Sequence, residues 1–410
     1  MMLNFPNLKG FSVSDGSVVM PLNMSEALSL VREGRLQDAS DLLMGHGTND
    51  VVFEKVTSRV QPQQNVVTSD LAARGLASVR EMLSKLDLRS GKARITPDWD
   101  AGVHTTSGYR SASDVPSASG PGRFERVAFS HHGASHPYYL YTPTTAAPPS
   151  GRPLVMMLHG CTQDAQDFSR GTRMNATAEA SGALVLYPTQ NQSANANGCW
   201  NWFRPEDQRA GAGEPALLRA MLKHANEAQA VDTQHVYVAG LSAGGAMAAV
   251  LAQQYPSVFA AVGVHSGLAP GAATTMMGAL SAMKSGAKGW QVPIANDRFQ
   301  AVPMIVMHGD ADNTVHQRNA EQLLQSGLAG LPTTVQTQEQ GVSRDGQRYT
   351  RTCVVDSAAS SQVVAEHWLL HGAGHAWSGG DARGSHASAR GVDASAEMLR
   401  FFLAQPPKSV

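Results

Sequence analysis

The pattern of apolar and polar positions changes near residue 123. From there on, short apolar runs alternate with stretches of helical spacing, which predicts a mostly parallel sheet covered by helices, an α/β fold. Several runs are continuously apolar, as expected of strands that are buried on both faces. The first two predicted strands flank Gly133 and are expected to pair as an antiparallel hairpin. The predicted strands are Arg126–Ser130, Tyr138–Tyr141, Leu154–Leu158, Ala183–Tyr187, His235–Ala239, Ala261–His265, Met304–Met307 and Val363–Leu369. The predicted helices are Arg173–Ser181, Glu214–Ala228, Gly245–Gln254, His316–Leu324 and Ala394–Leu403.

The N-terminal part of the chain has a different pattern. Within residues 1–99, apolar positions recur at helical spacing in Ser25–Val31 and Leu36–Met44, and again in Leu71–Leu86. One helical pair cannot bury its apolar face alone, so this helical extension should pack on the main domain, on a second copy or on a partner surface. Residues 100–122 are rich in Ser, Gly and Pro and are expected to form a linker to an α/β domain over 123–410.

A Gly-Leu-Ser-Ala-Gly pentapeptide at 240–244 directly follows the predicted strand His235–Ala239. A serine on a sharp turn between a strand and a helix projects from the sheet edge, where its hydroxyl can attack a carbonyl. The turn strains the serine backbone, so its neighbours must be small, as Gly240 and Gly244 are. Ser242 is therefore the candidate nucleophile, although a glycine-rich turn without chemistry remains the alternative.

A serine nucleophile needs a base and an acid that orients the base, and on this kind of fold they follow in the order serine, acid, histidine. The segment 308–312 follows the strand Met304–Met307 and offers Asp310 and Asp312 as the acid. The last predicted strand leads to His371 and His375. Spacing leaves the acid undecided and favours His375, which lies further from its strand, over His371.

The loop 159–163, which follows the strand Leu154–Leu158, is the candidate oxyanion loop. Its proposed donor is the backbone N–H of Cys161, and the second is the N–H of Ala243, the residue after the nucleophile. Such donors stabilise the negative charge that develops on a carbonyl oxygen. The alternative is an ordinary tight turn between a strand and a helix.

Composition narrows the classes of partner. The 410 residues carry a formal net charge of −1, and only 16% are charged, which argues against a nucleic-acid-binding protein. No apolar run approaches 18 residues, so no membrane span is expected. The first residues lack a basic stretch followed by an apolar core, which favours a cytoplasmic over an extracellular location. The histidines lack partners at ligand spacing, so we expect neither a metal nor another cofactor.

Five ordered motifs resemble the polyhydroxybutyrate (PHB) depolymerase family of esterases, which are α/β-hydrolases. The resemblance covers roughly residues 125–405. It implies Ser242 as nucleophile, Asp312 as acid and His375 as base, and a disulfide between Cys161 and Cys199. The motifs lie at 158–163, 198–203, 240–245, 308–315 and 374–380.

The resemblance further implies hydrolysis, through an acyl-enzyme, of short-chain polyhydroxyalkanoate such as poly-3-hydroxybutyrate, or of its oligomers. The alternatives are an esterase for acetyl or feruloyl esters of plant walls, and a non-catalytic granule-surface protein acting through the N-terminal helices. Trp200, Trp202 and Trp377 are candidates for exposed aromatics that bind a polyester, oligomer or small ester. The alternative is that they pack in the interior, as most tryptophans do. Residues 270–301 are expected to form either a mobile lid or a packed insert. The N-terminal helices are candidates for granule association or self-association.

Overall fold

The computed structural model describes residues 120–291, 301–329, 331, 334–357 and 362–408. The chain divides into two compact units, Met1–Ser107 and Gly108–Val410. The predicted helical extension at 1–99, and the linker up to residue 119, lie outside the described residues. The account below concerns the second unit.

A ten-stranded sheet forms the centre of this unit, in the order β1-β4-β6-β5-β7-β8-β9-β12-β11-β10. The strands from β6 to β12 in this order pair in parallel. Two antiparallel strands extend each edge. The strands are β1 (Arg123–Val127), β4 (Tyr138–Thr142), β5 (Arg152–Leu158), β6 (Leu184–Pro188), β7 (Val231–Leu241), β8 (Ala261–His265), β9 (Met304–Gly309), β10 (Thr334–Val342), β11 (Arg348–Asp356) and β12 (Gln362–Leu370).

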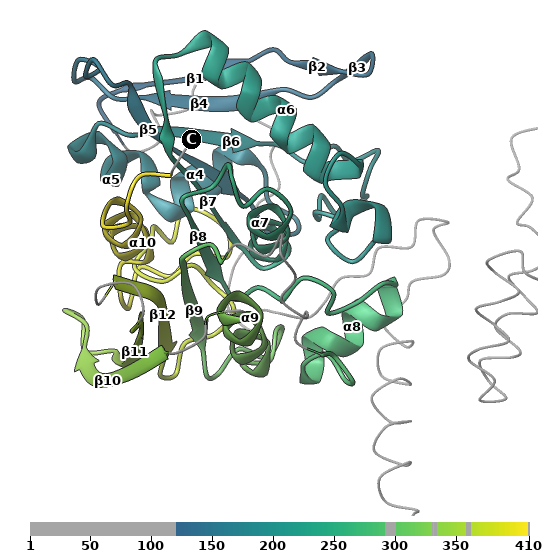
Figure 1. The fold of residues 1–410 in the computed structure, drawn as a ribbon, viewed down its shortest axis with the longest axis vertical. Coiled ribbons are helices and arrows are strands. Elements are labelled where there is room, and N and C mark those ends of the chain that lie inside the picture. The colour runs from purple at the N-terminus through teal and green to yellow at the C-terminus, as the bar shows by residue number, and fades with distance from the viewer. Residues whose placement is uncertain (1–119, 292–300, 330, 332–333, 358–361, 409–410) are drawn as a thin grey trace, which may run out of the picture. The chain divides into compact units, whose positions relative to one another are not determined.

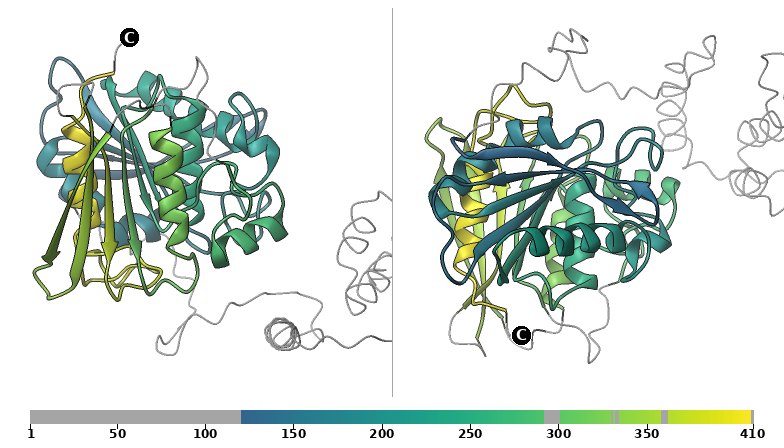
Figure 2. Two further views of the ribbon diagram at one scale, coloured as in Figure 1. Left: turned by 60° about the horizontal axis from the view of Figure 1, so that its bottom comes forward. Right: turned by 90° about the horizontal axis from the view of Figure 1, so that it is seen from above.

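Helices cover both faces of the sheet (Figure 1). One hydrophobic cluster joins the sheet to α6, α7 and α9, and a second joins its other face to α4, α5 and α10. The left view of Figure 2 shows the strands between α10, in yellow, and α9, in green. The helices are α4 (Ala165–Thr172), α5 (Met174–Ser181), α6 (Gly213–Ala228), α7 (Ala243–Gln254), α8 (Met276–Ser285), α9 (Arg318–Leu328) and α10 (Ala394–Leu403), with a short 3₁₀ turn, η1 (Pro205–Gln208).

The parallel sheet and its covering helices confirm the predicted α/β architecture. The expected antiparallel pairing of the first two strands is also confirmed, since Arg126 lies opposite Tyr139. A small two-stranded ribbon, β2 (Ser130–His131) and β3 (Ala134–Ser135), surrounds Gly133 between them. The 270–301 segment contains α8, and residues 292–300 of it lie outside the described part of the chain.

The sequence did not predict α4, the hairpin of β10 and β11, or the short elements β2, β3 and η1. The side chains of β10 are almost all exposed and are dominated by Thr, Gln and Glu, so the strand carries no apolar alternation. It forms because β11 supplies a paired edge, with Thr334 opposite Asp356 and Val342 opposite Arg348. Pairing to a neighbour, not the local pattern, makes it a strand.

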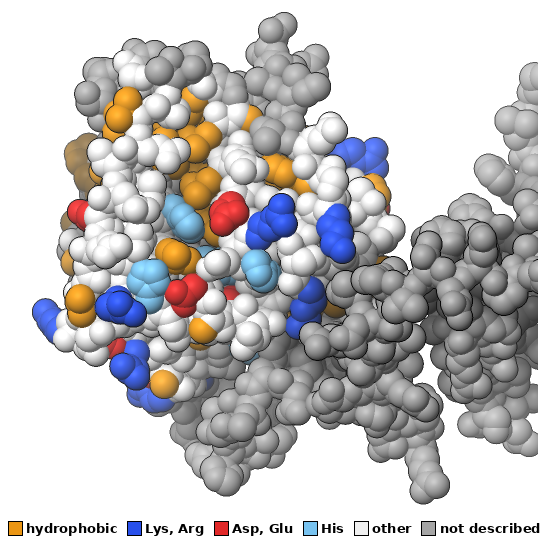
Figure 3. All heavy atoms as spheres, turned by 90° about the horizontal axis from the view of Figure 1, so that it is seen from below, with side chains coloured by type: hydrophobic (Ala, Val, Ile, Leu, Met, Phe, Trp, Pro, Cys, Tyr) orange, Lys and Arg blue, Asp and Glu red, His pale blue; other side chains and the backbone are white. Residues whose placement is uncertain are grey.

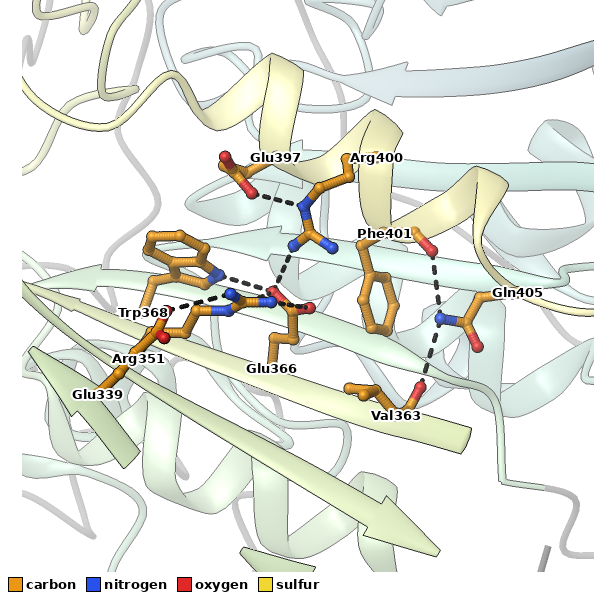
Figure 4. Close-up of polar contacts among 9 residues, drawn as sticks. All are labelled: Glu339, Arg351, Val363, Glu366, Trp368, Glu397, Arg400, Phe401 and Gln405. Carbon is orange, nitrogen blue, oxygen red and sulfur yellow. Dashed lines mark hydrogen bonds and ion pairs between the residues drawn. The ribbon is translucent and has the colours of Figure 1, made fainter. Parts of the chain in front are cut away.

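A buried carboxylate ties this edge of the sheet to α10 (Figure 4). Glu366 on β12 is only 1% exposed and accepts hydrogen bonds from Arg351 on β11 at 2.8 Å and from Arg400 on α10 at 2.6 Å. The indole N–H of Trp368 also donates to Glu366, at 3.0 Å. Burial raises the pKa of Glu366, but the two guanidinium groups have the larger, opposite effect. The pKa is therefore lowered overall. The strand that leads to His371 and His375 is thus fixed from both sides.

Candidate active site

Ser242 lies on a sharp turn between β7 and α7. Its backbone has φ 56° and ψ −119°, a left-handed conformation that costs a non-glycine residue about 1–3 kcal/mol. Its N–H donates to the carbonyl of His265 on β8 at 2.9 Å, and its carbonyl accepts from Ala246 N–H in the first turn of α7. Ser242 is 8% exposed, so nearly all of this residue is buried.

Close backbone approach explains the glycines of this turn. A Cβ atom on Gly244 would lie 2.0 Å from the carbonyl oxygen of Leu158, and one on Gly240 would lie 2.4 Å from the carbonyl carbon of Gly244. These distances are far below van der Waals contact. The glycines therefore let α7 begin directly against the end of β5, and this brings the residues that follow β5 next to Ser242.

The structure pairs His375 with Asp312. The Nδ1 atom of His375 lies 2.7 Å from Oδ2 of Asp312, whose other oxygen accepts the N–H groups of Thr314 and Val315 at 2.9 and 2.8 Å. The side chain of Asp312 is fully buried and that of His375 is 9% exposed. Burial raises the pKa of Asp312, but His375 and the backbone donors lower it more, to about 2. Asp312 is thus a fixed negative charge that orients the imidazole.

His308 braces the loop that carries Asp312. Its Nε2 donates to the carbonyl of Val315 at 2.7 Å and lies 3.7 Å from Oδ2 of Asp312. Burial lowers the pKa of His308, so the imidazole is neutral. The sequence reading used this histidine only as part of a motif and missed its contact with the acid.

Asp310 and His371, the other candidates for the acid and the base, also pair with each other. Nδ1 of His371 lies 2.8 Å from Oδ2 of Asp310, and the N–H of Gly372 donates to Oδ1 at 2.6 Å. On its far side, Nε2 of His371 lies 2.9 Å from the Thr350 hydroxyl. Asp310 and His371 therefore form a second, half-exposed pair that connects the two loops.

The candidate oxyanion loop lies against the nucleophile. A Cβ on Gly160 would be 3.6 Å from the Cβ of Ser242. Among the described residues, the backbone N–H groups of Cys161 and Ala243 donate no hydrogen bond. The Ala243 N–H is also at the N-terminus of α7, where the helix dipole favours negative charge. Assignment of these two groups as oxyanion donors stays a prediction, and their unpaired state fits it.

The predicted disulfide between Cys161 and Cys199 is confirmed. It joins the candidate oxyanion loop to the segment 199–203, and Thr162 N–H adds a hydrogen bond to the carbonyl of Asn197 at 2.7 Å. Cys353, the third cysteine, is a free thiol. The bridge links two of the motif segments covalently, next to Ser242.

The expected exposed aromatics are instead buried. Trp200, Trp202 and Trp377 are 0%, 5% and 1% exposed. Trp200 packs against His159 and Trp377 against His265, at ring-centroid distances of 5.5 and 5.4 Å. These indoles support the loops around Ser242 because large aromatic surfaces are stable when packed. A direct contact of any of them with substrate stays a prediction.

Charge is dispersed on one face of the described part of the chain. Seen from below, basic and acidic side chains are scattered among uncharged ones, without a continuous area of one sign on this face (Figure 3). The described residues also contain no group of three or more His, Cys, Asp or Glu side chains arranged to hold a metal ion. None of the helices described is both long and apolar enough to cross a membrane.

Comparison with known proteins gives one family and several relatives. The family model for esterase PHB depolymerase matches residues 136–350. Poly(3-hydroxyalkanoate) depolymerase C of Paucimonas lemoignei is 38% identical over 34% of this chain and 33% of its own length. Poly(3-hydroxybutyrate) depolymerase of Ralstonia pickettii is 33% identical over 39% and 36%, respectively. The chain thus spans about a third of the length of these two curated relatives.

Two further comparisons cover a larger share of the compared protein. Feruloyl esterase B of Neurospora crassa is 30% identical over 49% of this chain and 75% of its own length. Among solved structures, acetyl xylan esterase from Aspergillus awamori superimposes with a TM-score of 0.50 at 18% identity, covering 69% of this chain and all of that one. This likeness confirms the α/β-hydrolase fold. Since the family model spans more than half of the sequence, the chain belongs to the esterase PHB depolymerase family.

Proposed function

We propose that the protein is a serine esterase that hydrolyses short-chain polyhydroxyalkanoate, or its oligomers, through Ser242, His375 and Asp312. The observation that carries the proposal is one arrangement: a strained serine on a sharp turn, a buried Asp–His pair, and two unpartnered N–H groups next to the serine. Membership of the family supports ester hydrolysis, and the two depolymerase relatives favour the polyester substrate.

In the proposed mechanism, Nε2 of His375 takes the proton of Ser242 as the hydroxyl oxygen attacks the ester carbonyl. The N–H groups of Cys161 and Ala243 bind the oxyanion, and the protonated imidazole then gives its proton to the leaving alcohol. Water, activated by the same imidazole, hydrolyses the acyl-enzyme and frees the acid. Asp312 keeps the proton of the neutral imidazole on Nδ1, so that Nε2 faces the serine, and stabilises the cation that forms.

A second candidate substrate is an acetyl or feruloyl ester of plant-wall polysaccharide. It is favoured by the feruloyl esterase relative, of which this chain covers three quarters. Product release from 3-hydroxybutyrate oligomers and from feruloyl and acetyl xylan esters, compared at equal enzyme concentration, separates the two. A higher kcat/KM on the plant-wall esters contradicts the polyester assignment but keeps the mechanism.

The Ser242→Ala variant tests the mechanism itself. Removal of the nucleophile should lower kcat on p-nitrophenyl butyrate by about 10⁶-fold, to the background left by binding and the oxyanion donors. An active variant refutes the triad, whereas a wild type without turnover would favour the non-catalytic granule-surface protein.

Cytoplasmic location and attachment to a polyester granule, or self-association, through residues 1–99 also stay proposals. A chain that lacks residues 1–99 should lose co-sedimentation with poly-3-hydroxybutyrate granules and keep its activity on p-nitrophenyl butyrate. Equal co-sedimentation of the two proteins contradicts attachment through this segment.

A further inference from the structure

A further buried carboxylate, that of Glu214, takes no part in the proposed mechanism. Glu214, in the first turn of α6, is 7% exposed. Its Oε1 accepts hydrogen bonds from the side-chain amides of Gln190 at 2.5 Å and Asn201 at 2.6 Å, and its Oε2 accepts the backbone N–H of Asn201 at 2.7 Å. Among the described residues, no Lys, Arg or His forms an ion pair with it.

The donors belong to the segments that shape the site. Asn201 lies in the segment 199–203, two residues after the disulfide-bonded Cys199. The Gln190 side chain also donates to the carbonyl of Cys199 at 2.9 Å. The two carboxylate oxygens of Glu214 therefore bind both the disulfide-linked segment 199–203 and the loop after β6.

A chain of hydrogen bonds continues from this hub to the oxyanion loop. The backbone N–H of Gln190 donates to Nε2 of His159 at 3.1 Å, so the proton of this neutral, fully buried imidazole is on Nδ1. Nδ1 then donates to the carbonyl of Gly160 at 2.8 Å. In a trans peptide the carbonyl of Gly160 and the N–H of Cys161 point in opposite directions. The bond from His159 thus sets the direction of the candidate oxyanion donor.

We propose that Glu214, as an ionised carboxylate, is a positioning residue that holds the oxyanion loop and the segment 199–203 in their active arrangement. The proposal rests on the proposed function. An ionised carboxylate accepts all three bonds, whereas a protonated one keeps some acceptor capacity but has to place a hydrogen atom among three donors. A glutamine at this position does the same with its NH₂ group.

Glu214 binds a proton close to neutral pH. Burial raises its pKa from the ordinary 4.5 to about 7, and the charge of Asp207 adds to the rise, whereas Asn201 and Gln190 oppose it. Asp207 on η1 faces Glu214 and accepts its backbone N–H at 2.7 Å, and Arg204 and Glu206 flank Asp207. His159 reaches Glu214 only through Gln190. Activity should therefore depend on the deprotonation of Glu214 at the acid side of the pH profile.

The test compares Glu214→Gln with Glu206→Gln, which removes the same charge from an exposed position on η1. Turnover of p-nitrophenyl butyrate is measured with the full chain and divided by the number of serines that a fluorophosphonate labels. Glu214→Gln should lower kcat about tenfold to hundredfold with a small change in KM, because an oxyanion donor is misplaced. Glu206→Gln should match the wild type. Wild-type turnover in the same assay shows that the ester hydrolysis of the proposed function is present, so a fully active Glu214→Gln variant contradicts the role of Glu214 alone.

The pH profile separates positioning from a merely structural role. Below pH 7, the logarithm of kcat should rise more steeply with pH in the wild type than in Glu214→Gln, because only the wild type carries the titrating Glu214. Gln190→Met removes one donor to the carboxylate and should move the acid limb to higher pH. Equal slopes in the wild type and Glu214→Gln, or an unmoved limb in Gln190→Met, overturn the proposal.

Thermal stability gives a readout that does not depend on turnover. The folded protein holds the Glu214 proton more tightly than the unfolded chain does, so ionisation of this group destabilises the fold as pH rises from 4.5 to about 7. The Tm of the wild type should therefore fall relative to that of Glu214→Gln over this range. A constant difference in Tm contradicts a titrating Glu214.

Discussion

Two aspartate–histidine pairs connect the same two loops, and they differ in burial. The side chains of Asp312 and His375 are 0% and 9% exposed, and their hydrogen bond is 2.7 Å long. Those of Asp310 and His371 are 32% and 30% exposed, and theirs is 2.8 Å long. The hydrogen bonds are nearly equal, so geometry within a pair does not tell the two apart.

The surroundings of the two pairs decide what each can do. Water screens the outer pair, so its charges interact weakly, whereas the buried charge of Asp312 acts on the imidazole in a medium of low polarity. The outer pair faces Thr350, near the start of β11. The inner pair lies among buried side chains, with His308 3.7 Å from Asp312. We infer that the inner pair serves the chemistry and the outer pair serves the connection between the loops.

The largest expected effect is that of Asp312→Asn. The amide leaves the shape of the site but no longer holds the imidazole in the tautomer that presents Nε2 to the serine, so kcat should fall by about 10⁴-fold. Turnover of p-nitrophenyl butyrate measures it, with Asp310→Asn as the matched control. Similar losses in the two variants would remove the distinction between the pairs.

The acid end of the stability curve gives the next largest effect. The pKa of Asp312 is lowered from the ordinary 3.8 to about 2. The stabilisation of the fold by ionised Asp312 is therefore complete above pH 3.8 and is lost as the pH falls toward 2. This amounts to about 2 kcal/mol. Asp312→Asn should therefore flatten the dependence of unfolding free energy on pH between 2 and 4. Asp310, whose pKa is lowered in spite of partial burial, should show the same sign with a smaller change.

Loss of the outer pair should have a modest effect on catalysis. In Asp310→Asn the exposed pair loses about 1 kcal/mol or less, so kcat should fall by less than about fivefold. The cause is a looser connection between the loops, because Asp310 also accepts the N–H of Gly372. Steady-state kinetics at pH 8 measures the change, and a loss above a hundredfold would assign the outer pair to the chemistry.

The smallest effect is expected for Thr350→Val. This nearly isosteric change removes the hydroxyl 2.9 Å from Nε2 of His371 and leaves β11 intact. A partly exposed hydrogen bond contributes about 1 kcal/mol to stability, so Tm should drop by a few degrees at most while kcat stays unchanged. A drop in kcat beyond tenfold would give Thr350 a part in the reaction.

The sequence predicted the sheet and most of its helices because buried parallel strands are continuous apolar runs. It missed β10 for the opposite reason, since an edge strand of Thr, Gln and Glu is held by its neighbour. The motif order located the candidate triad, but spacing alone left both pairs open, because one sequence does not say which side chain of a loop turns inward. The sequence also left open whether the tryptophans are exposed or packed, and the structure buries all three.

Glu214 was missed as a functional residue because its local pattern has a simpler explanation. An acidic residue in the first turn of an amphipathic helix is common, since the helix dipole stabilises its negative charge. Its role depends on Gln190 and Asn201, which belong to two other loops, and only the folded chain brings them to one carboxylate. A glutamate followed by proline, at 214 and 215, was the one available signal and was not specific.

The rate at which a fluorophosphonate labels Ser242 tests the central claim most directly, because it reports the activated serine without any assumption about the natural substrate. Mass spectrometry of the peptide that contains Ser242 should show full labelling of the wild type. Labelling of Asp310→Asn should be within about fivefold of that rate, and labelling of Asp312→Asn at least a hundredfold slower. Equal rates in the two variants, or a slower rate in Asp310→Asn, would contradict the account.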